Sequence, residues 1–288
     1  MIYLQVLANG LVLGGLYAGI AVGFSLVWGV LNVINIMHGS FVVLGSYIAY
    51  FAYAFFGIHP FLSVVLAGAA LGALAYPLQA GLINRVVGAP VLMTLTLTFG
   101  LDLILNNGML LAFKADYRKL TLEKPLGSLQ AGPVVLPLDR VAATLLALLL
   151  TFTLYRLLRD SRIGRAIVAV RMDREAALLM GVDVKRINAV TFAIGALMAG
   201  AAGSLLSLIY PISPLNSGLF LSKAFVVCVL GGLGSVPGAM VGGLALGLVE
   251  AFGAFWLGPE NVTSLSFGLL ILLLMVRPSG LLGRKGYE

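Results

Sequence analysis

Long apolar stretches dominate this chain of 288 residues. A helix needs about 20 mostly apolar residues to cross a bilayer, and the sequence predicts about nine such spans, within a range of eight to ten. They cover roughly 4–29, 39–57, 60–84, 90–113, 134–156, 187–210, 219–234, 237–257 and 262–277. Charged residues make up only 10% of the chain, against about 25% in soluble domains. The apolar stretches are continuous rather than alternating, which disfavours a β-barrel. The sequence therefore predicts an all-α, polytopic membrane helix bundle that forms one domain over 1–288.

Basic residues set the expected orientation of the bundle, because short loops rich in Lys and Arg stay in the cytoplasm. Eight of the 18 Lys and Arg fall in one segment, 156–186: Arg156, Arg159, Arg162, Arg165, Arg171, Arg174, Lys185 and Arg186. Arg85 after the third span, and Arg277, Arg284 and Lys285 after the last, fit the same side. We therefore expect the N-terminus outside, the C-terminus in the cytoplasm and the 114–133 loop facing outward. Topology explains the net charge of +7, so it does not indicate a nucleic acid partner.

The basic segment contains a short amphipathic helix. Asp173 suits its N-terminal cap, and Gly181 suits its C-terminal end. The apolar side chains of Ala176, Ala177, Leu179, Met180 and Val182 form a patch on such a helix. The spacing leaves two interpretations open: the patch binds a partner protein, or the helix lies on the lipid surface.

A polar run, Asn32–Ser40, interrupts the first long apolar stretch. Asn35 and His38 are three residues apart and would be neighbours on a helix. The expected topology favours a short cytoplasmic turn between the first two spans. The alternative is a broken helix beside a solute path. His38 has no companion motif that would indicate a metal site or catalysis.

The fourth span carries a polar stripe in which Thr94, Thr98, Asp102 and Asn106 recur every four residues and so share one helical face. Asp102 lies near mid-membrane, where an ionised carboxylate costs at least about 2.5–3.5 kcal/mol. The stripe must therefore face a solute pathway or hydrogen-bond to other helices. Lys223 and Glu250 are the other charged residues inside apolar spans, and they are expected to pair with each other or with Asp102.

The chain shows no pattern typical of an enzyme. The glycine-rich stretch 230–238 lacks the Lys-Ser or Lys-Thr of a phosphate-binding loop and is interpreted as a tight turn. Cys228 is the only cysteine, which excludes an intrachain disulfide and a cysteine-based metal site. No triad order, paired carboxylates or metal-ligand spacing is present, so we expect neither catalytic nor metal-binding residues.

The whole chain resembles the permease subunits of bacterial branched-chain amino acid ABC importers, the LivH family. Three regions in this order carry the resemblance. They are Asn32-Val33-Ile34-Asn35-Ile36-Met37-His38-Gly39; Arg165-Ala166 through Asp173, Glu175-Ala176-Ala177 and Gly181, followed by Ala199–Gly203; and Gly231-Gly232-Leu233-Gly234-Ser235-Val236-Pro237-Gly238.

The resemblance implies a type II ABC importer-like permease in the bacterial inner membrane. The cytoplasmic loop at about 156–186 would hold the coupling helix, which contacts an ATPase subunit through Arg171, Asp173, Glu175, Ala176, Ala177, Met180 and Gly181. The implied partners are a second related permease, two ATP-binding cassette subunits and a periplasmic substrate-binding protein. This chain itself would carry no cofactor, because ATP and Mg²⁺ bind to the partner subunits.

The expected solute is Leu, Ile or Val, and the residues themselves suggest Asn32, Asn35, Thr94, Thr98 and Asp102 as lining of the translocation path. Three alternative functions stay open. The first is a permease for another small solute such as urea, an amide or another amino acid. The second is a self-sufficient secondary transporter or channel, and the third is a purely structural subunit.

Overall fold

Helices make up most of the protein in a computed structural model that describes residues 2–123, 126–132 and 134–282. The α-helices are α1 (Ile2–Leu31), α2 (His38–Phe56), α3 (Pro60–Gly81), α4 (Val91–Phe113), α5 (Leu138–Asp160), α6 (Arg162–Met172), α7 (Arg174–Leu179), α8 (Val184–Leu206), α9 (Ser217–Gly231), α10 (Val236–Leu257) and α11 (Val262–Val276). Three 3-10 turns join them: η1 (Ile83–Arg85), η2 (Pro214–Asn216) and η3 (Pro259–Asn261). Within these described residues, nine helical segments are long and apolar enough to cross a membrane. The prediction of an all-α polytopic bundle is confirmed.

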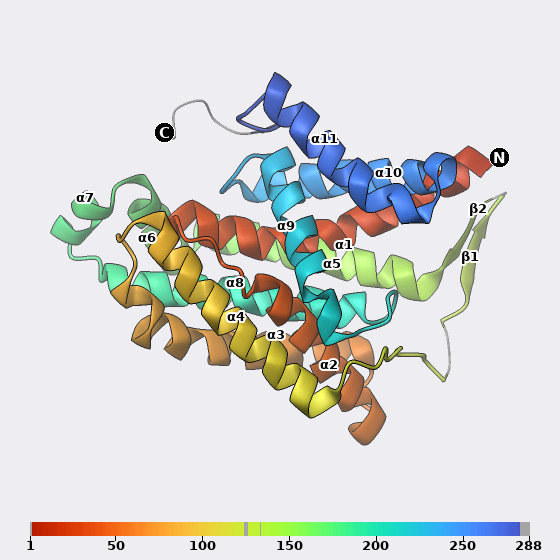
Figure 1. The fold of residues 1–288 in the computed structure, drawn as a ribbon, viewed down its shortest axis with the longest axis horizontal. Coiled ribbons are helices and arrows are strands. Elements are labelled where there is room, and N and C mark those ends of the chain that lie inside the picture. Colours follow the sequence, from red (N-terminus) through yellow and green to blue (C-terminus); the bar gives the residue numbers. More distant parts are fainter. Residues whose placement is uncertain (1, 124–125, 133, 283–288) are drawn as a thin grey trace.

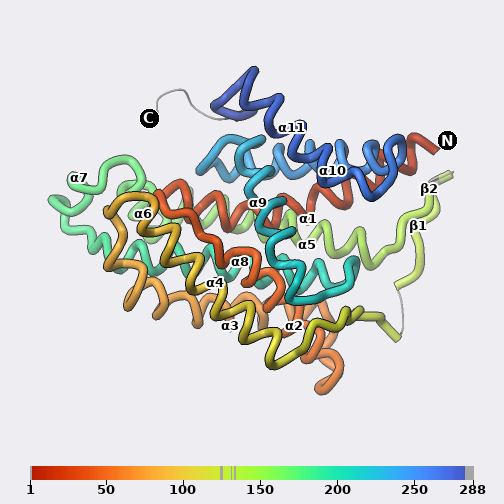
Figure 2. The backbone as a smooth tube through the Cα atoms, viewed as in Figure 1, coloured from red at the N-terminus to blue at the C-terminus, as the bar shows by residue number. Residues whose placement is uncertain are grey.

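The two ends of the bundle differ in character. The short helices α6 and α7 lie at one end, and the N-terminus lies at the other with the strands β1 (Ser128–Ala131) and β2 (Val134–Pro137) (Figure 1). Figure 2 traces the chain as it passes back and forth between these ends. The turn that carries Arg85 lies at the α7 end, because the Asn84 side chain donates to the carbonyl of Lys185 at 3.0 Å. The Arg85 turn and the segment with α6 and α7 thus share one end, opposite the N-terminus, as the predicted topology requires. Arg284 and Lys285 lie outside the described residues.

The fifth span begins later than the sequence predicts. Residues 134–137 form β2, which pairs antiparallel with β1 and matches Leu129 with Leu136. Pro137 precedes the first turn of α5, and the helix then continues to Asp160. The Gln5 side chain fixes the hairpin to α1, because it donates to the carbonyl of Val135 and accepts from its N–H. The strand replaces a helical turn because these backbone groups find partners in the hairpin and in α1.

Glycines allow the central helices to pack backbone against backbone. The helix α1 packs antiparallel along α10, and a Cβ on Gly14 would lie only 2.7 Å from the Cα of Leu244. At the crossing of α9 and α10, Gly231 faces Gly238. Membrane helices have little hydrophobic drive to associate, so close van der Waals packing at small residues holds them together.

A similar arrangement of helices occurs twice in the chain. Both α1 and α8 are long helices, and each is followed by a segment without α-helix that leads to a shorter helix, α2 and α9 respectively. Helix α1 packs along α10, just as α8 packs along α3. Gly23 faces Gly195 while Gly19 faces Ala202, so α1 and α8 run antiparallel. The second unit is therefore inverted relative to the first, a plan typical of transporters.

The α1–α10 contact should be intolerant of a single methyl group. Gly14→Ala places its Cβ 2.7 Å from the Cα of Leu244 and should lower the free energy of unfolding by about 1–3 kcal/mol. Gly108→Ala in α4 is the matched control, because nothing lies within 4 Å of the added Cβ. Thermal unfolding in detergent measures both. Equal melting temperatures for Gly14→Ala and the control would refute close packing at this crossing.

Candidate functional site

The chain turns back into the bundle after α1 instead of forming a turn at its end. Residues 32–37 are non-helical, and Val33, Asn35 and Met37 are buried. The ring Nε2 of His38 donates to the carbonyl of Ile20 at 2.8 Å. Ile20 is eleven residues before the end of α1, which at 1.5 Å per residue is about 16 Å along the helix. The preferred prediction of a short cytoplasmic turn is therefore wrong for residues 33–37, which return into the bundle as a non-helical break between α1 and α2. After the exposed Asn32, the segment covers this distance with the side chains of Val33, Asn35 and Met37 buried in the bundle.

The polar stripe on α4 contacts the segment 32–37 and the first turns of α2 and α9. Thr98 Oγ1 donates to the carbonyl of Ile34 at 2.8 Å. Ser40 Oγ donates to the Asp102 carboxylate at 2.5 Å, and the Asn106 side chain donates to Ser217 Oγ at 2.6 Å. Thr94 Oγ1, by contrast, donates to Val91 within its own helix. Of the two predictions for the stripe, the structure shows hydrogen bonding between helices.

These contacts bring the N-terminal ends of α2 and α9 together inside the bundle. Ser40 and Ser217 belong to the first turns of these helices, and a Cβ on Gly39 would meet the carbonyl of Ser217. The first turn of a helix exposes free N–H groups and a partial positive charge. Asp102 lies at the first turn of α2, where a carboxylate interacts favourably with that charge. Ser40 and Ser217 were not predicted site residues, since a lone serine gives no signal in sequence.

Asn35 has hydrogen-bonding capacity that the fold does not use. Its side chain is 1% exposed, and neither Oδ1 nor Nδ2 has a hydrogen-bond partner among the described residues. Leaving such a buried group unsatisfied costs about 1–3 kcal/mol. The Nδ1 atom of His38 is buried without a partner in the same part of the structure. Asn32, in contrast, is exposed, with a left-handed φ of 53°.

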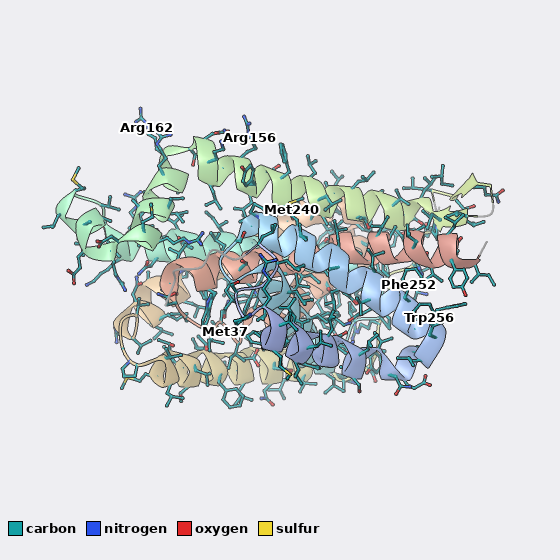
Figure 3. All side chains as sticks on the ribbon, turned by 90° about the horizontal axis from the view of Figure 1, so that it is seen from above. Met37, Arg156, Arg162, Met240, Phe252 and Trp256 are labelled. Carbon is teal, nitrogen blue, oxygen red and sulfur yellow. The ribbon has the colours of Figure 1, made fainter. Side chains whose placement is uncertain are left out.

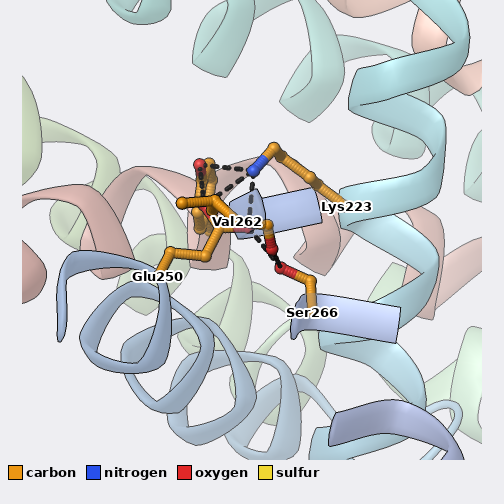
Figure 4. A network of polar contacts seen from close by, with 5 residues as sticks. Lys223, Glu250, Val262 and Ser266 are labelled. Carbon is orange, nitrogen blue, oxygen red and sulfur yellow. Dashed lines mark hydrogen bonds and ion pairs between the residues drawn. The ribbon is translucent and has the colours of Figure 1, made fainter. Parts of the chain in front are cut away.

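A buried ion pair, with two neighbouring hydroxyl groups, joins four helices of the bundle (Figure 4). Lys223 of α9 lies 2.5 Å from Glu250 of α10, and their side chains are 14% and 3% exposed. Tyr17 of α1 donates to Glu250 at 2.6 Å and accepts from Lys223 at 2.9 Å. Ser266 of α11 donates to Glu250 at 2.8 Å. The sequence left the partner of Lys223 open, and the structure pairs it with Glu250 rather than with Asp102.

The short helix α7 is capped at both ends. The Asp173 carboxylate accepts from the backbone N–H groups of Glu175 and Ala176, both at 2.9 Å. At the other end the N–H of Gly181 bonds to Leu178 and the N–H of Val182 bonds to Ala177. This is a Schellman motif, and Gly181 adopts the φ of +81° that it requires. The caps stabilise a six-residue helix that would be too short to persist alone in water.

The helix α7 presents an apolar tip. Leu179 and Met180 are 89% and 84% exposed, and Leu178 is 57% exposed. Ala177, which the sequence places in the apolar patch, is buried instead against Val170 and Val184. The small side chain of Ala177 lets α7 lie close to α6 and α8. The outward surface of α7 therefore consists of its neighbours, Glu175 and Ala176 before it and Leu178, Leu179 and Met180 after it.

The basic segment contacts the glycine-rich turn before α10. The Arg171 guanidinium lies against Gly234, where an added Cβ would be 3.2 Å from its terminal nitrogen. Gly234 in turn packs on Gly29 near the end of α1. Across the described ranges, no group of three or more His, Cys, Asp and Glu side chains is placed to hold a metal ion.

Residues 6–276 match the family model described as branched-chain amino acid transport system / permease component. The chain is 36% identical to the high-affinity branched-chain amino acid transport system permease protein BraD of Pseudomonas aeruginosa, over 99% of this chain and 97% of that one. It is also 36% identical to the corresponding permease protein LivH of Escherichia coli K12, with the same coverage. A probable permease protein LivH of Methanocaldococcus jannaschii is 29% identical over 97% of this chain and 92% of that one.

A more limited similarity links the chain to a second type of permease. It is 34% identical to the permease protein LivM of E. coli K12, over 51% of this chain and 35% of that one. No solved structure matches the chain significantly.

The buried ion pair predicts strongly coupled mutational effects. Lys223→Met leaves Glu250 without its charge partner, and Glu250→Leu leaves Lys223 without one, so each should lower the free energy of unfolding by about 3–5 kcal/mol. The double variant should lose much less than the sum of the two. Arg156→Gln, which breaks the exposed pair with Asp160, is the control and should cost under about 1 kcal/mol. Denaturant titration measures all four, and additive losses would contradict the pairing.

Proposed function

This chain belongs to the family of permease components of branched-chain amino acid transport systems, and from this membership we propose that it is a permease subunit of an ATP-driven importer for Leu, Ile and Val. The near full-length match to transport permeases carries the proposal. The chain itself makes and breaks no bonds, and its task is to provide a controlled path across the bacterial inner membrane.

The proposal includes partners. A second, related permease would complete the translocation path, and the partial similarity to LivM supports this partner. Two ATPase subunits would bind at the cytoplasmic end, where ATP and Mg²⁺ would be held, and a periplasmic binding protein would deliver the solute to the outer end. The binding protein can supply the selectivity, so the path needs only moderate affinity.

The capped helix α7 is the part of this chain best suited to bind an ATPase. Its rigid caps fix Leu179 and Met180 in an exposed position at the cytoplasmic end. Large exposed apolar side chains that are held rigidly form favourable anchors at protein interfaces. Arg171 connects this region to the turn between α9 and α10 through Gly234, so movement of the helix would reach the membrane part through direct contacts.

The non-helical segment 32–37, with the helix ends beside it, is the part of this chain best suited to line the solute path. Broken helices in transporters supply free helix ends for the polar groups of a solute, and the first turns of α2 and α9 meet here beside Asp102. Asn35 adds an unused amide. A site for an apolar amino acid needs only a few polar groups in mostly apolar surroundings. The few polar side chains here, within largely apolar helices, meet that need.

Charge at the tip of α7 should separate the ATPases from the permease. Leu179→Asp with Met180→Asp should leave stability within about 0.5 kcal/mol, because both side chains are exposed. Association with the ATPase subunits should weaken at least about thirtyfold for each anchor residue lost. Copurification in mild detergent measures this, with Arg162→Asp as the control, since Arg162 points away from the bundle (Figure 3). Undiminished ATPase recovery with the double variant would instead favour an α7 that rests on lipid.

Uptake by the reconstituted complex tests the proposed solute. Proteoliposomes that contain this permease and its copurifying subunits should take up labelled leucine only with ATP inside and the binding protein outside. Unlabelled isoleucine and valine should compete, and urea should not. Uptake of urea without uptake of leucine would assign the chain to another small solute. Leucine uptake by this chain alone, driven by a proton or sodium gradient, would favour a self-sufficient transporter.

A further inference from the structure

A large cavity opens at the cytoplasmic end of the bundle. Its volume is about 1620 Å³, and it lies among the cytoplasmic ends of α1, α5, α9 and α11, with α6 and the turn before α10 as further walls. Pockets for drug-sized molecules usually measure about 300–1,000 Å³. A leucine-sized solute would fill only a small part of this space, so the cavity is large enough for a bigger ligand.

The charged side chains that line the cavity, among the residues that the structure describes, are basic. They are Arg159, Arg171 and Arg277, and that part of the lining contains no Asp or Glu. Asp160 lies nearby, but it pairs with Arg156 at 2.8 Å and is 3.9 Å from Arg159. Arginine is especially suited to phosphate, because its planar guanidinium can donate two parallel hydrogen bonds. The cavity is therefore complementary to an anion with several oxygens.

The remaining wall is largely aliphatic and runs toward the middle of the membrane. Leu26 and Val30 lie one turn apart on α1, and Phe225 and Val229 lie one turn apart on α9. These pairs extend the apolar surface for at least a helical turn away from the arginines. The arrangement places cationic groups at the cytoplasmic end of the helices and apolar groups at greater depth.

We propose that this cavity binds one anionic phospholipid of the inner leaflet. Arg159 and Arg277 hold the phosphate at the depth where lipid headgroups lie, and the aliphatic wall accommodates the upper part of an acyl chain. Basic pockets between transmembrane helices at the cytoplasmic side bind anionic lipid headgroups in this way. A free phosphate would satisfy the arginines alone and leave the apolar wall in contact with water.

Native mass spectrometry of the purified full chain with added phospholipid tests this proposal. The wild type should retain one phosphatidylglycerol and show little retention of phosphatidylcholine. Arg159→Gln with Arg277→Gln should weaken phosphatidylglycerol retention about thirtyfold, on the basis of the attraction of each basic residue for anionic lipid. Arg162→Gln is the matched control and should behave like the wild type, because Arg162 is in the same basic segment and points outward (Figure 3).

Thermal unfolding with and without added lipid provides a second readout. Phosphatidylglycerol should raise the melting temperature of the wild type and of Arg162→Gln, and leave that of the double variant unchanged. Melting of the double variant at the wild-type temperature in phosphatidylcholine alone would establish that it is folded. Equal lipid retention by the double variant, equal retention of phosphatidylcholine, or the same stabilisation by inorganic phosphate would each overturn the proposal.

Discussion

The need to pair every backbone N–H and C=O away from water determines where the parts of this protein lie. A continuous helix meets that need internally, but a break inside a membrane does not. The segment 32–37 is such a break, and it survives because protein surrounds it. Thr98 donates to the carbonyl of Ile34, and the amide of His38 donates to the carbonyl of Asn35. One residue of the polar stripe of α4, Thr98, thus serves the break directly, while Asp102 and Asn106 bind the helices α2 and α9.

A second theme is rigidity achieved with small residues and a few strong polar contacts. Glycines at the crossings of α1 with α10 and of α9 with α10 leave no room for sliding. The Lys223–Glu250 pair, with Tyr17 and Ser266, then ties α9 to three neighbours. A chain of direct contacts runs from α7 through α6 to the turn that precedes α10.

Much of the fold and part of the candidate site were predictable from the sequence. The hydropathy pattern located the spans because apolar length is what the bilayer selects, and the caps Asp173 and Gly181 delimited α7 because capping is local. The four-residue spacing identified the polar face of α4 correctly. The path of residues 32–37 was mispredicted, because a polar run between two apolar spans is equally compatible with a turn in water and with a buried break. Ala177 was misplaced because one face of a two-turn helix cannot be assigned before its neighbours are known.

The sequence by itself determined that this is a polytopic helical membrane protein and where the short helix α7 begins and ends. Both follow from local composition and from interactions between residues close in the chain. The tertiary structure decided that Lys223 pairs with Glu250, that Ser40 and Ser217 bring two helix ends to α4, and that arginines from three separate segments line one cavity. These facts depend on which helices become neighbours, and that choice is made by packing along whole helices, which no short stretch of sequence encodes.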